Sequence, residues 1–510
     1  MKIKTVRDSL NFMKMQNWLA KKNVLPFLVF LVPLLLRAVP EILMGPFIVG
    51  FDTLGFYVPN VVLWLHSGVN LWSFLVSAPL FYTILFSIVD AGGPLIVVLK
   101  IIPPLLLGFL GLSIYIYARK GLNWSPNKSA LPALLGTLYF VALRVSWDML
   151  RNELALVFFF TVLTLLNVRQ HSSWKRYLVL SFAILAVVLS NQIGAIIMLG
   201  VVLFAVIAKL LRKEYIQGVN LIIVSLPGVL FFVLVSLNGL VQAGILSYSA
   251  DVMSPLASWT GFTSYPSMLI SEAGFFLYCY LPLLPLVLIG LRRFGNLQLR
   301  SWLLVCLILL FFPISVSPYR WVLMLMYPLA FYATDALSRL KSIKWKRLKF
   351  TAHRIAILYL VLSTAILSFG FIFMTSEVPF FYFNSNYFNN YVSQIPSSML
   401  QNTISITDCR DTSNALQWFR GNVNSSALLL THTVFYGWAL LMVNNTQVTN
   451  YGFGDPAKAA TVASQKGYSQ IYLIWWINGQ GWYGQPTIPS SFHEVYQSGE
   501  IAIYNYAPNY

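Results

Sequence analysis

Apolar residues fill most of this chain in long, nearly uninterrupted runs, without the strict alternation typical of half-buried strands. A run of about 20 residues is long enough to cross ~30 Å of hydrocarbon as a helix. The sequence therefore predicts about eleven membrane-spanning helices. They are expected at residues 24 to 44, 95 to 118, 130 to 147, 153 to 168, 177 to 191, 193 to 210, 217 to 237, 273 to 291, 301 to 317, 321 to 338 and 355 to 375.

The segment from residue 45 to 94 departs from this pattern because prolines break its apolar pieces. It also contains Trp64, Trp72, Phe81 and Tyr82, side chains that are enriched where a membrane meets water. We expect a long first external loop whose helices lie on the membrane surface.

The tail from residue 376 to 510 is the size of a domain and has turn signals at short intervals. Helices are expected at 412 to 421, capped by Asp411 or Thr412, and at 456 to 467, capped by Asp455. Strands are expected at 427 to 431, 447 to 451 and 470 to 476, with a hairpin of 492 to 497 and 500 to 506. The predicted fold class is an all-α polytopic membrane domain (1 to 375) with an external α/β domain (376 to 510).

Composition supports a membrane class, since 58% of the residues are hydrophobic and only 10% are charged. The net charge of +18 could indicate nucleic-acid binding, but most Lys and Arg residues fall in the N-terminus and in alternate loops. That asymmetry predicts a multi-pass protein of the cell membrane with a cytoplasmic N-terminus and an extracytoplasmic C-terminal domain. It also removes the support for a nucleic-acid partner.

Asp52 lies just beyond the first predicted span, within Gly50 to Tyr57. A poorly hydrated carboxylate at the external surface has a raised pKa and can act as a general base. Tyr57 is a neighbouring candidate for substrate binding. The alternative is that Asp52 caps a surface helix through the backbone of Thr53 and Leu54.

Two arginines are placed at external turns, Arg151 after Asp148 and Arg320 after Tyr319. A guanidinium at the membrane edge can bind a lipid phosphate through two hydrogen bonds and stabilise its growing charge. The alternative is that both side chains extend to the headgroups of bulk lipid.

Three further cations lie within predicted spans, Arg37, Lys100 and Arg144. We expect them to pair with acids on the same side, because an unpaired charge there costs at least ~2.5 kcal/mol. The available acids are Glu41, Asp90 and Asp148.

Other polar groups carry weaker signals. Asn191 and Gln192 either bind a sugar or turn the chain. The histidines and cysteines have no metal-binding spacing. The tail contains an aromatic set for which core packing is the better interpretation, and two glycosylation sequons. The aromatic set is Trp475, Trp476, Trp482 and Tyr483, and the sequons are Asn424-Ser425-Ser426 and Asn444-Asn445-Thr446.

This arrangement resembles the GT-C superfamily of membrane glycosyltransferases, which includes protein O-mannosyltransferases, aminoarabinose transferases and oligosaccharyltransferase catalytic subunits. The residues that carry the resemblance are Asp52 and Tyr57, Ala78 to Tyr82, Arg151 to Leu154, Ser317 to Trp321, Tyr327-Pro328 and, in the tail, Ala415 to Phe419.

The resemblance implies a polyprenyl-phosphate sugar donor, a lipid, glycan or protein acceptor, and a catalytic role for Asp52. It implies Asp148 or Glu153 as a second acid. No cofactor is required, and a divalent Mg²⁺ or Mn²⁺ ion, used by some members, is not indicated. Thr431 to Gly437 lacks the Trp-Trp-Asp-Tyr-Gly motif of oligosaccharyltransferases, which favours transfer of a single sugar. The leading hypothesis is an inverting glycosyltransferase. The alternatives are oligosaccharyltransferase-like transfer to protein, and a secondary transporter or flippase.

Overall fold

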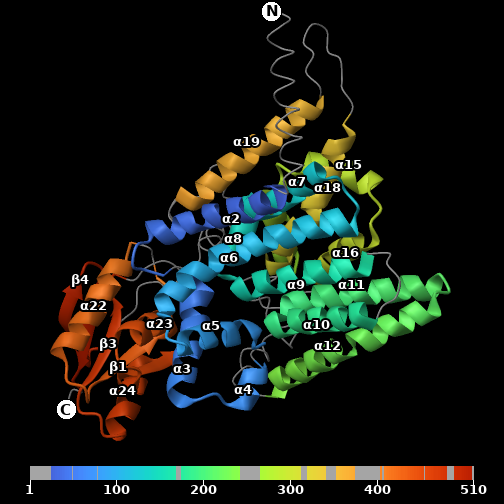
Figure 1. The fold of residues 1–510 in the computed structure, drawn as a ribbon. Helices are drawn as coiled ribbons and strands as arrows, with labels where there is room; N and C mark the ends of the chain where they lie inside the picture. The colour runs from blue at the N-terminus through green and yellow to red at the C-terminus, as the bar shows by residue number, and fades with distance from the viewer. Residues whose placement is uncertain are drawn as a thin grey trace, which may run out of the picture.

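The computed structural model of the protein describes residues 24–48, 50–76, 78–167, 174–241, 265–311, 319–340, 352–373, 402–404, 407–452, 454–478 and 488–507. It has a helical part and, beside it, a smaller part built on a five-stranded sheet (Figure 1). The helices of the first part are α2 (Val24–Leu43), α3 (Val58–Ser67), α4 (Leu71–Val76), α5 (Leu80–Asp90), α6 (Leu95–Ile116), α7 (Pro126–Leu138), α8 (Phe140–Asp148), α9 (Leu150–Asn167), α10 (Trp174–Ser190), α11 (Gln192–Leu211), α12 (Tyr215–Val241), α14 (Tyr265–Tyr280), α15 (Leu284–Arg293), α16 (Leu297–Phe311), α17 (Tyr319–Met324), α18 (Met326–Arg339) and α19 (Ala352–Phe373), with π-helical turns η1 (Thr53–Tyr57) and η2 (Tyr117–Gly121).

Each predicted span overlaps at least one of these helices, but not all of the helices have spanning length. Within the described residues, six helices are long and apolar enough to cross a membrane, or eight if two bent pairs count as spans. Helix α12 has an exposed apolar face, as expected of a membrane-spanning helix: Ile216, Ile223 and Leu230, which share a face, are 79%, 61% and 59% exposed. The total of about eleven spans stays a prediction.

Three predicted spans are each divided into two helices, which corrects the expectation of continuous runs. Helices α7 and α8 bend by 58° and α14 and α15 by 94°, while α17 and α18 meet at Leu325. Pro282 lies between α14 and α15, and Pro328 lies in the first turn of α18. Because proline has no backbone N–H, neither residue can continue the hydrogen bonding of the helix before it. Helix α14 also begins at Tyr265, before the start of the span predicted at 273 to 291.

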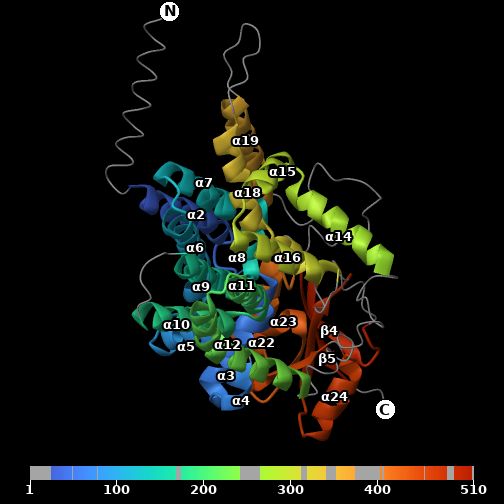
Figure 2. The same ribbon diagram turned by 90° about the vertical axis from the view of Figure 1, so that its right-hand side faces the viewer.

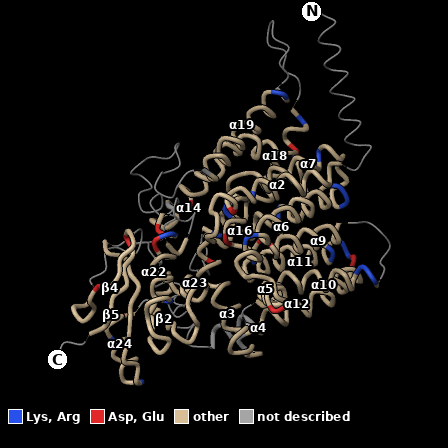
Figure 3. Tube along the Cα trace, turned by 60° about the vertical axis from the view of Figure 1, so that its left-hand side comes forward, with Lys and Arg blue, Asp and Glu red and all other residues tan. Residues whose placement is uncertain are grey.

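The polar contacts separate the helical part into two ends. At one end the Asn167 amide donates to Gln298 (2.7 Å) and Lys128 pairs with Asp335 (2.7 Å). These residues come from segments predicted to face the cytoplasm, and Figure 3 shows Lys and Arg gathered near α7, α9 and α10. The chain turns that carry Asp52, Arg151 and Arg320 meet at the opposite end. The alternation of loops therefore agrees with the contacts.

The first predicted external loop is helical, with η1, α3, α4 and α5 following one another. These helices share a continuous apolar core with the C-terminal part, in which Leu54 and Phe81 belong with Phe435 and Trp438. Figure 2 shows α23 beside α3.

The C-terminal part has the sheet order β2-β1-β3-β5-β4. Strand β1 pairs in parallel with β2 and β3, while β5 pairs antiparallel with β3 and β4. The predicted α/β class and the positions of the five strands are confirmed. The elements are α22 (Cys409–Asn422), β1 (Leu428–His432), α23 (Thr433–Met442), η4 (Asn445–Gln447), β2 (Val448–Gly452), α24 (Pro456–Gln465), β3 (Ile471–Trp476), β4 (Phe492–Ser498) and β5 (Ile501–Tyr506).

Two local predictions in this part fare differently. Asp455 caps α24 as expected, since its carboxylate accepts a hydrogen bond from the Ala457 N–H at 2.8 Å. The start predicted for α22 was wrong, because the helix begins at Cys409 and neither Asp411 nor Thr412 caps it. The residue before it, Asp408, instead accepts a hydrogen bond from the indole of Trp476.

The aromatic residues expected to pack the core behave as predicted where they are described. Trp475 and Trp476 are 7% and 1% exposed, whereas Trp482 and Tyr483 lie outside the described residues. Helix α23 was not predicted.

Candidate functional site

The backbone that carries Asp52 is unusual on both sides of that residue. Gly50 has φ +106°, and a Cβ there would lie 2.8 Å from the Asp148 Cβ and 2.9 Å from the Thr53 hydroxyl. Only glycine fits this position without displacing its neighbours. The π-helical turn η1 begins directly after Asp52. Such turns are rare and frequently occur at functional sites.

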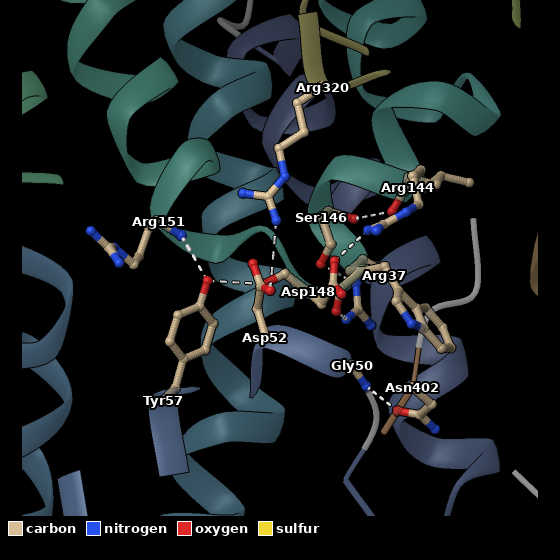
Figure 4. Close-up of polar contacts among 12 residues, drawn as sticks. Arg37, Gly50, Asp52, Tyr57, Arg144, Ser146, Asp148, Arg151, Arg320 and Asn402 are labelled. Carbon is tan, nitrogen blue, oxygen red and sulfur yellow. Dashed lines mark hydrogen bonds and ion pairs between the residues drawn. The ribbon is translucent and has the colours of Figure 1, made fainter. Parts of the chain in front are cut away.

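The Asp52 side chain makes no hydrogen bond that caps η1, so the capping interpretation was wrong. Its Oδ1 instead lies 3.9 Å from Nη2 of Arg320 (Figure 4). Only 16% of the Asp52 side chain is exposed. This burial raises the pKa of Asp52 to about 6, against a lowering by the charge of Arg320 and a smaller raising by Asp148.

Arg320 comes from the first turn of α17, far along the chain from Asp52. Its side chain is 27% exposed, and its Nε has no hydrogen-bond partner among the described residues. Tyr319, which precedes it, packs edge-on against Phe275 of α14 with ring centres 6.2 Å apart. A donor nitrogen held at the edge of a buried site in this way is suited to binding an anion.

Arg151 lies in the first turn of α9. Its guanidinium stacks over the Tyr82 ring at 5.2 Å, and its Nε donates to the Ser190 carbonyl at 3.3 Å. Its positive charge also acts on Asp52, lowering that pKa less than Arg320 does. The lipid-headgroup interpretation of both arginines is therefore not needed to explain their placement.

Tyr57 ties this site together. Its hydroxyl donates to the backbone carbonyl of Asp148 (3.0 Å) and accepts from the backbone N–H of Arg151 (3.5 Å). It thus joins the end of η1 to the junction of α8 and α9. The hydroxyl hydrogen of Tyr57 is therefore used within the protein.

Asp148 lies beside Asp52 but is already paired. Its carboxylate binds Arg144 one helical turn earlier, and both side chains are 1% exposed. Its Oδ2 has no hydrogen-bond partner among the described residues. Asp148 is therefore the nearer of the two candidate second acids.

Arg37, from α2, supports the junction of α8 and α9. It donates to the carbonyls of Ser146 and Trp147 at 3.0 and 3.2 Å and pairs with Glu41 at 2.8 Å. The expected pairing of the three buried cations is confirmed, since Lys100 also contacts Glu41. Asp90, the third acid considered, is exposed.

The remaining candidates are Glu153, Asn191 and Gln192. Glu153 is fully buried in α9, near enough to Arg37 and Tyr327 to interact electrostatically, and both of its carboxylate oxygens lack hydrogen-bond partners among the described residues. Asn191 caps α11, accepting from the backbone of Ile193 and Gly194. Gln192 is exposed in the first turn of α11.

Sequence reasoning missed one residue at this site. The side chain of Asn402 accepts a buried hydrogen bond from the Gly50 N–H at 2.5 Å. Only the unusual Gly50 could have indicated that this loop needs external support. Within the described residues, no group of three or more His, Cys, Asp or Glu side chains is arranged to hold a metal ion.

Comparison with known proteins identifies the fold. No protein-family model matches the chain, and no curated protein matches its sequence. Among solved structures, the chain is similar to ArnT from Cupriavidus metallidurans in the apo state, with a TM-score of 0.55 over 96% of this chain and 98% of that one, at 12% identity.

A second similar structure is the archaeal oligosaccharyltransferase AglB from Archaeoglobus fulgidus in complex with an inhibitory peptide and a dolichol-phosphate. Its TM-score is 0.48, with 89% of this chain and 70% of that chain covered at 13% identity. The likeness to ArnT confirms the predicted GT-C fold.

Proposed function

We propose that this chain with a GT-C fold is an inverting membrane glycosyltransferase that takes a sugar from a polyprenyl-phosphate donor. Asp52 is its general base, and the acceptor is a lipid, glycan or protein on the external face. The observation that carries the proposal is the pair formed by the largely buried carboxylate of Asp52 and the guanidinium of Arg320, 3.9 Å apart.

The proposed reaction balances without a cofactor. The acceptor oxygen or nitrogen attacks the anomeric carbon from the face opposite the phosphate, so the configuration inverts. The bond from the anomeric carbon to the phosphate oxygen breaks, and the acceptor proton passes to Asp52. A pKa near 6 leaves Asp52 ionised at neutral pH and still basic enough to accept that proton.

Arg320 and Arg151 hold the leaving phosphate in this proposal. A phosphate leaves as an anion and needs no proton from an acid, so cations rather than a second carboxylic acid are required. Arg320 supplies an Nε without a partner in the described structure, and Arg151 is near enough for its positive charge to act on Asp52. Asp148 is then the residue that tunes Asp52, with Arg144 as its counter-ion.

The transporter alternative loses its motivation in the structure. Unpaired charges within spans would favour a transporter, but Arg37, Lys100 and Arg144 all have carboxylate partners. Oligosaccharyltransferase-like transfer differs from the proposal in moving a preassembled glycan to protein rather than a single sugar.

The test uses membranes from cells that lack the native protein and carry variants of it, supplied with synthetic prenyl-phosphate mannose or glucose labelled in the sugar. Asp52→Asn is expected to lower transfer by ~10² to 10⁴-fold, because it removes the base. Asp90→Asn is the matched control, an exposed carboxylate on the same loop. Transfer at the parent rate by Asp52→Asn contradicts the proposal.

A further inference from the structure

The loop that carries Asp52 is held by residues that lie far along the chain. Asn402 belongs to the segment 402–404, which comes after α19 in the chain, and its Oδ1 accepts a hydrogen bond from the Gly50 N–H. Asn402 is 8% exposed, so this hydrogen bond is shielded from water. The N–H of a residue with φ +106° points out of any regular helix, and Asn402 supplies its acceptor.

A second contact lies on the other side of Asp52, where helix α23 of the C-terminal part packs directly against η1. A Cβ on Gly437 would lie 1.9 Å from the carbonyl oxygen of Leu54, so the two backbones touch. Neighbouring Trp438 donates its indole N–H to the Thr403 hydroxyl (3.2 Å) and packs against Phe47, with ring centres 6.2 Å apart. The segment 402–404 and α23 are therefore joined to each other, and both contact the loop that carries Asp52.

We infer that Asn402 and Gly437 are positioning residues that fix Asp52 for catalysis, so that the C-terminal part completes the active site. The two contacts bracket the carboxylate: one holds Gly50, two residues before it, and the other holds Leu54, two residues after it. This inference rests on the proposed function.

The physical reason lies in the backbone between these contacts. A π-helical turn has a widened, irregular hydrogen-bond pattern, and Gly50 is the residue type with the greatest backbone freedom. Without fixed ends, this segment can shift by an ångström or more. A general base must lie within hydrogen-bond reach of the proton that it accepts, so a displacement of about 1 Å costs up to ~10²-fold in rate.

The experiment compares single variants with matched controls. Asn402→Ala removes the acceptor, and Gly437→Ala places a methyl group against Leu54. Their controls are Asn422→Ala, an exposed asparagine, and Gly421→Ala, whose Cβ meets open space in α22. Transfer from prenyl-phosphate mannose or glucose is measured per amount of folded protein, together with donor KM, kcat and the pH profile of kcat/KM.

We expect the two test variants to lose ~10 to 10²-fold in kcat with little change in donor KM, and to shift the acid limb of the pH profile. The controls are expected to match the wild type. Asn402→Asp keeps the acceptor oxygen, and the amide nitrogen that it replaces has no hydrogen-bond partner among the described residues. Asn402→Asp should retain most of the activity when transfer is measured at a pH well above the acid limb of the pH profile.

The inference fails if both test variants fold less well but keep wild-type kcat and pH profile per folded molecule. That result, with Asp52→Asn inactive, leaves the proposed function standing and limits these residues to structural support. If Asp52→Asn itself transfers sugar at the parent rate, the proposed function fails as well.

Discussion

Arg320 holds its Nη2 3.9 Å from Oδ1 of Asp52, close enough to act on its charge and too far for a direct hydrogen bond. Burial and Arg320 thus act in opposite directions on the same carboxylate, and burial is the larger effect. The result is a base whose protonation state changes just below neutral pH.

The pH dependence of transfer follows from that balance. Because only ionised Asp52 can accept a proton, kcat/KM should rise with pH and reach half of its plateau near pH 6. Arg320→Gln removes the largest of the three arginine effects and should move this midpoint to higher pH. Arg151→Gln should move it in the same direction by less. A pH–rate series on membranes carrying each variant measures the three midpoints, and a reversed ranking would contradict the assignment.

The free energy of unfolding should also depend on pH through the ionisation of Asp52. The pKa of Asp52 is about 6 in the folded protein and 3.8 as its ordinary value, so the unfolded chain loses its proton first as pH rises. Stability is therefore lost between about pH 4 and 6 and stays lower above that range. Asp52→Asn should abolish this loss, and at neutral pH the variant should be more stable by up to ~3 kcal/mol. Thermal unfolding in detergent at pH 4 and pH 7 measures it, with Asp90→Asn as the unchanged control.

The sequence predicted the charged residues of the site because a charged side chain is costly to place within a span and is therefore expected at its end. Asp52, Arg151 and Arg320 each follow or precede a long apolar run, so their common end of the helical part could be inferred from alternation alone. Arg151 and Glu153 show the limit of that reasoning. They are two residues apart on α9, so they point to different faces, and only Arg151 reaches the site.

Contacts between distant segments had no such signal. Asn402 is one asparagine among several in a polar stretch, and nothing local indicates that it accepts from Gly50. Helix α23 was missed because its apolar residues continue directly from buried strand β1, and a short apolar run does not distinguish a strand from a helix. The breaks within three predicted spans were missed because hydropathy indicates how long an apolar run is, but not whether the helix axis changes direction within it.

Asn191 provides a test that separates structural from substrate-binding roles. Its side-chain oxygen caps α11, so Asn191→Ala should lower stability by about 0.5 to 2 kcal/mol. Asn191→Ser keeps an acceptor at this position and should retain most of that stability. Donor KM is expected to be unchanged in both variants. A stable Asn191→Ser variant with a raised donor KM would instead assign the amide to the sugar.

The predicted orientation can be tested by chemical labelling. Cys279, Cys306 and Cys409 are all buried, so a membrane-impermeant maleimide should leave the wild-type protein unlabelled. Ser426→Cys introduces an exposed thiol in the C-terminal part, and Lys120→Cys introduces one at the opposite end of the helical part.

If basic loops face the cytoplasm, intact cells should label only Ser426→Cys. Lys120→Cys should react only after the membrane is permeabilised, which also serves as the control that its thiol is reactive. Labelling of Lys120→Cys in intact cells, with Ser426→Cys protected, would invert the topology and move Asp52 to the cytoplasmic side. The donor would then have to be presented from that side, and the acceptor assigned to the external face would be wrong.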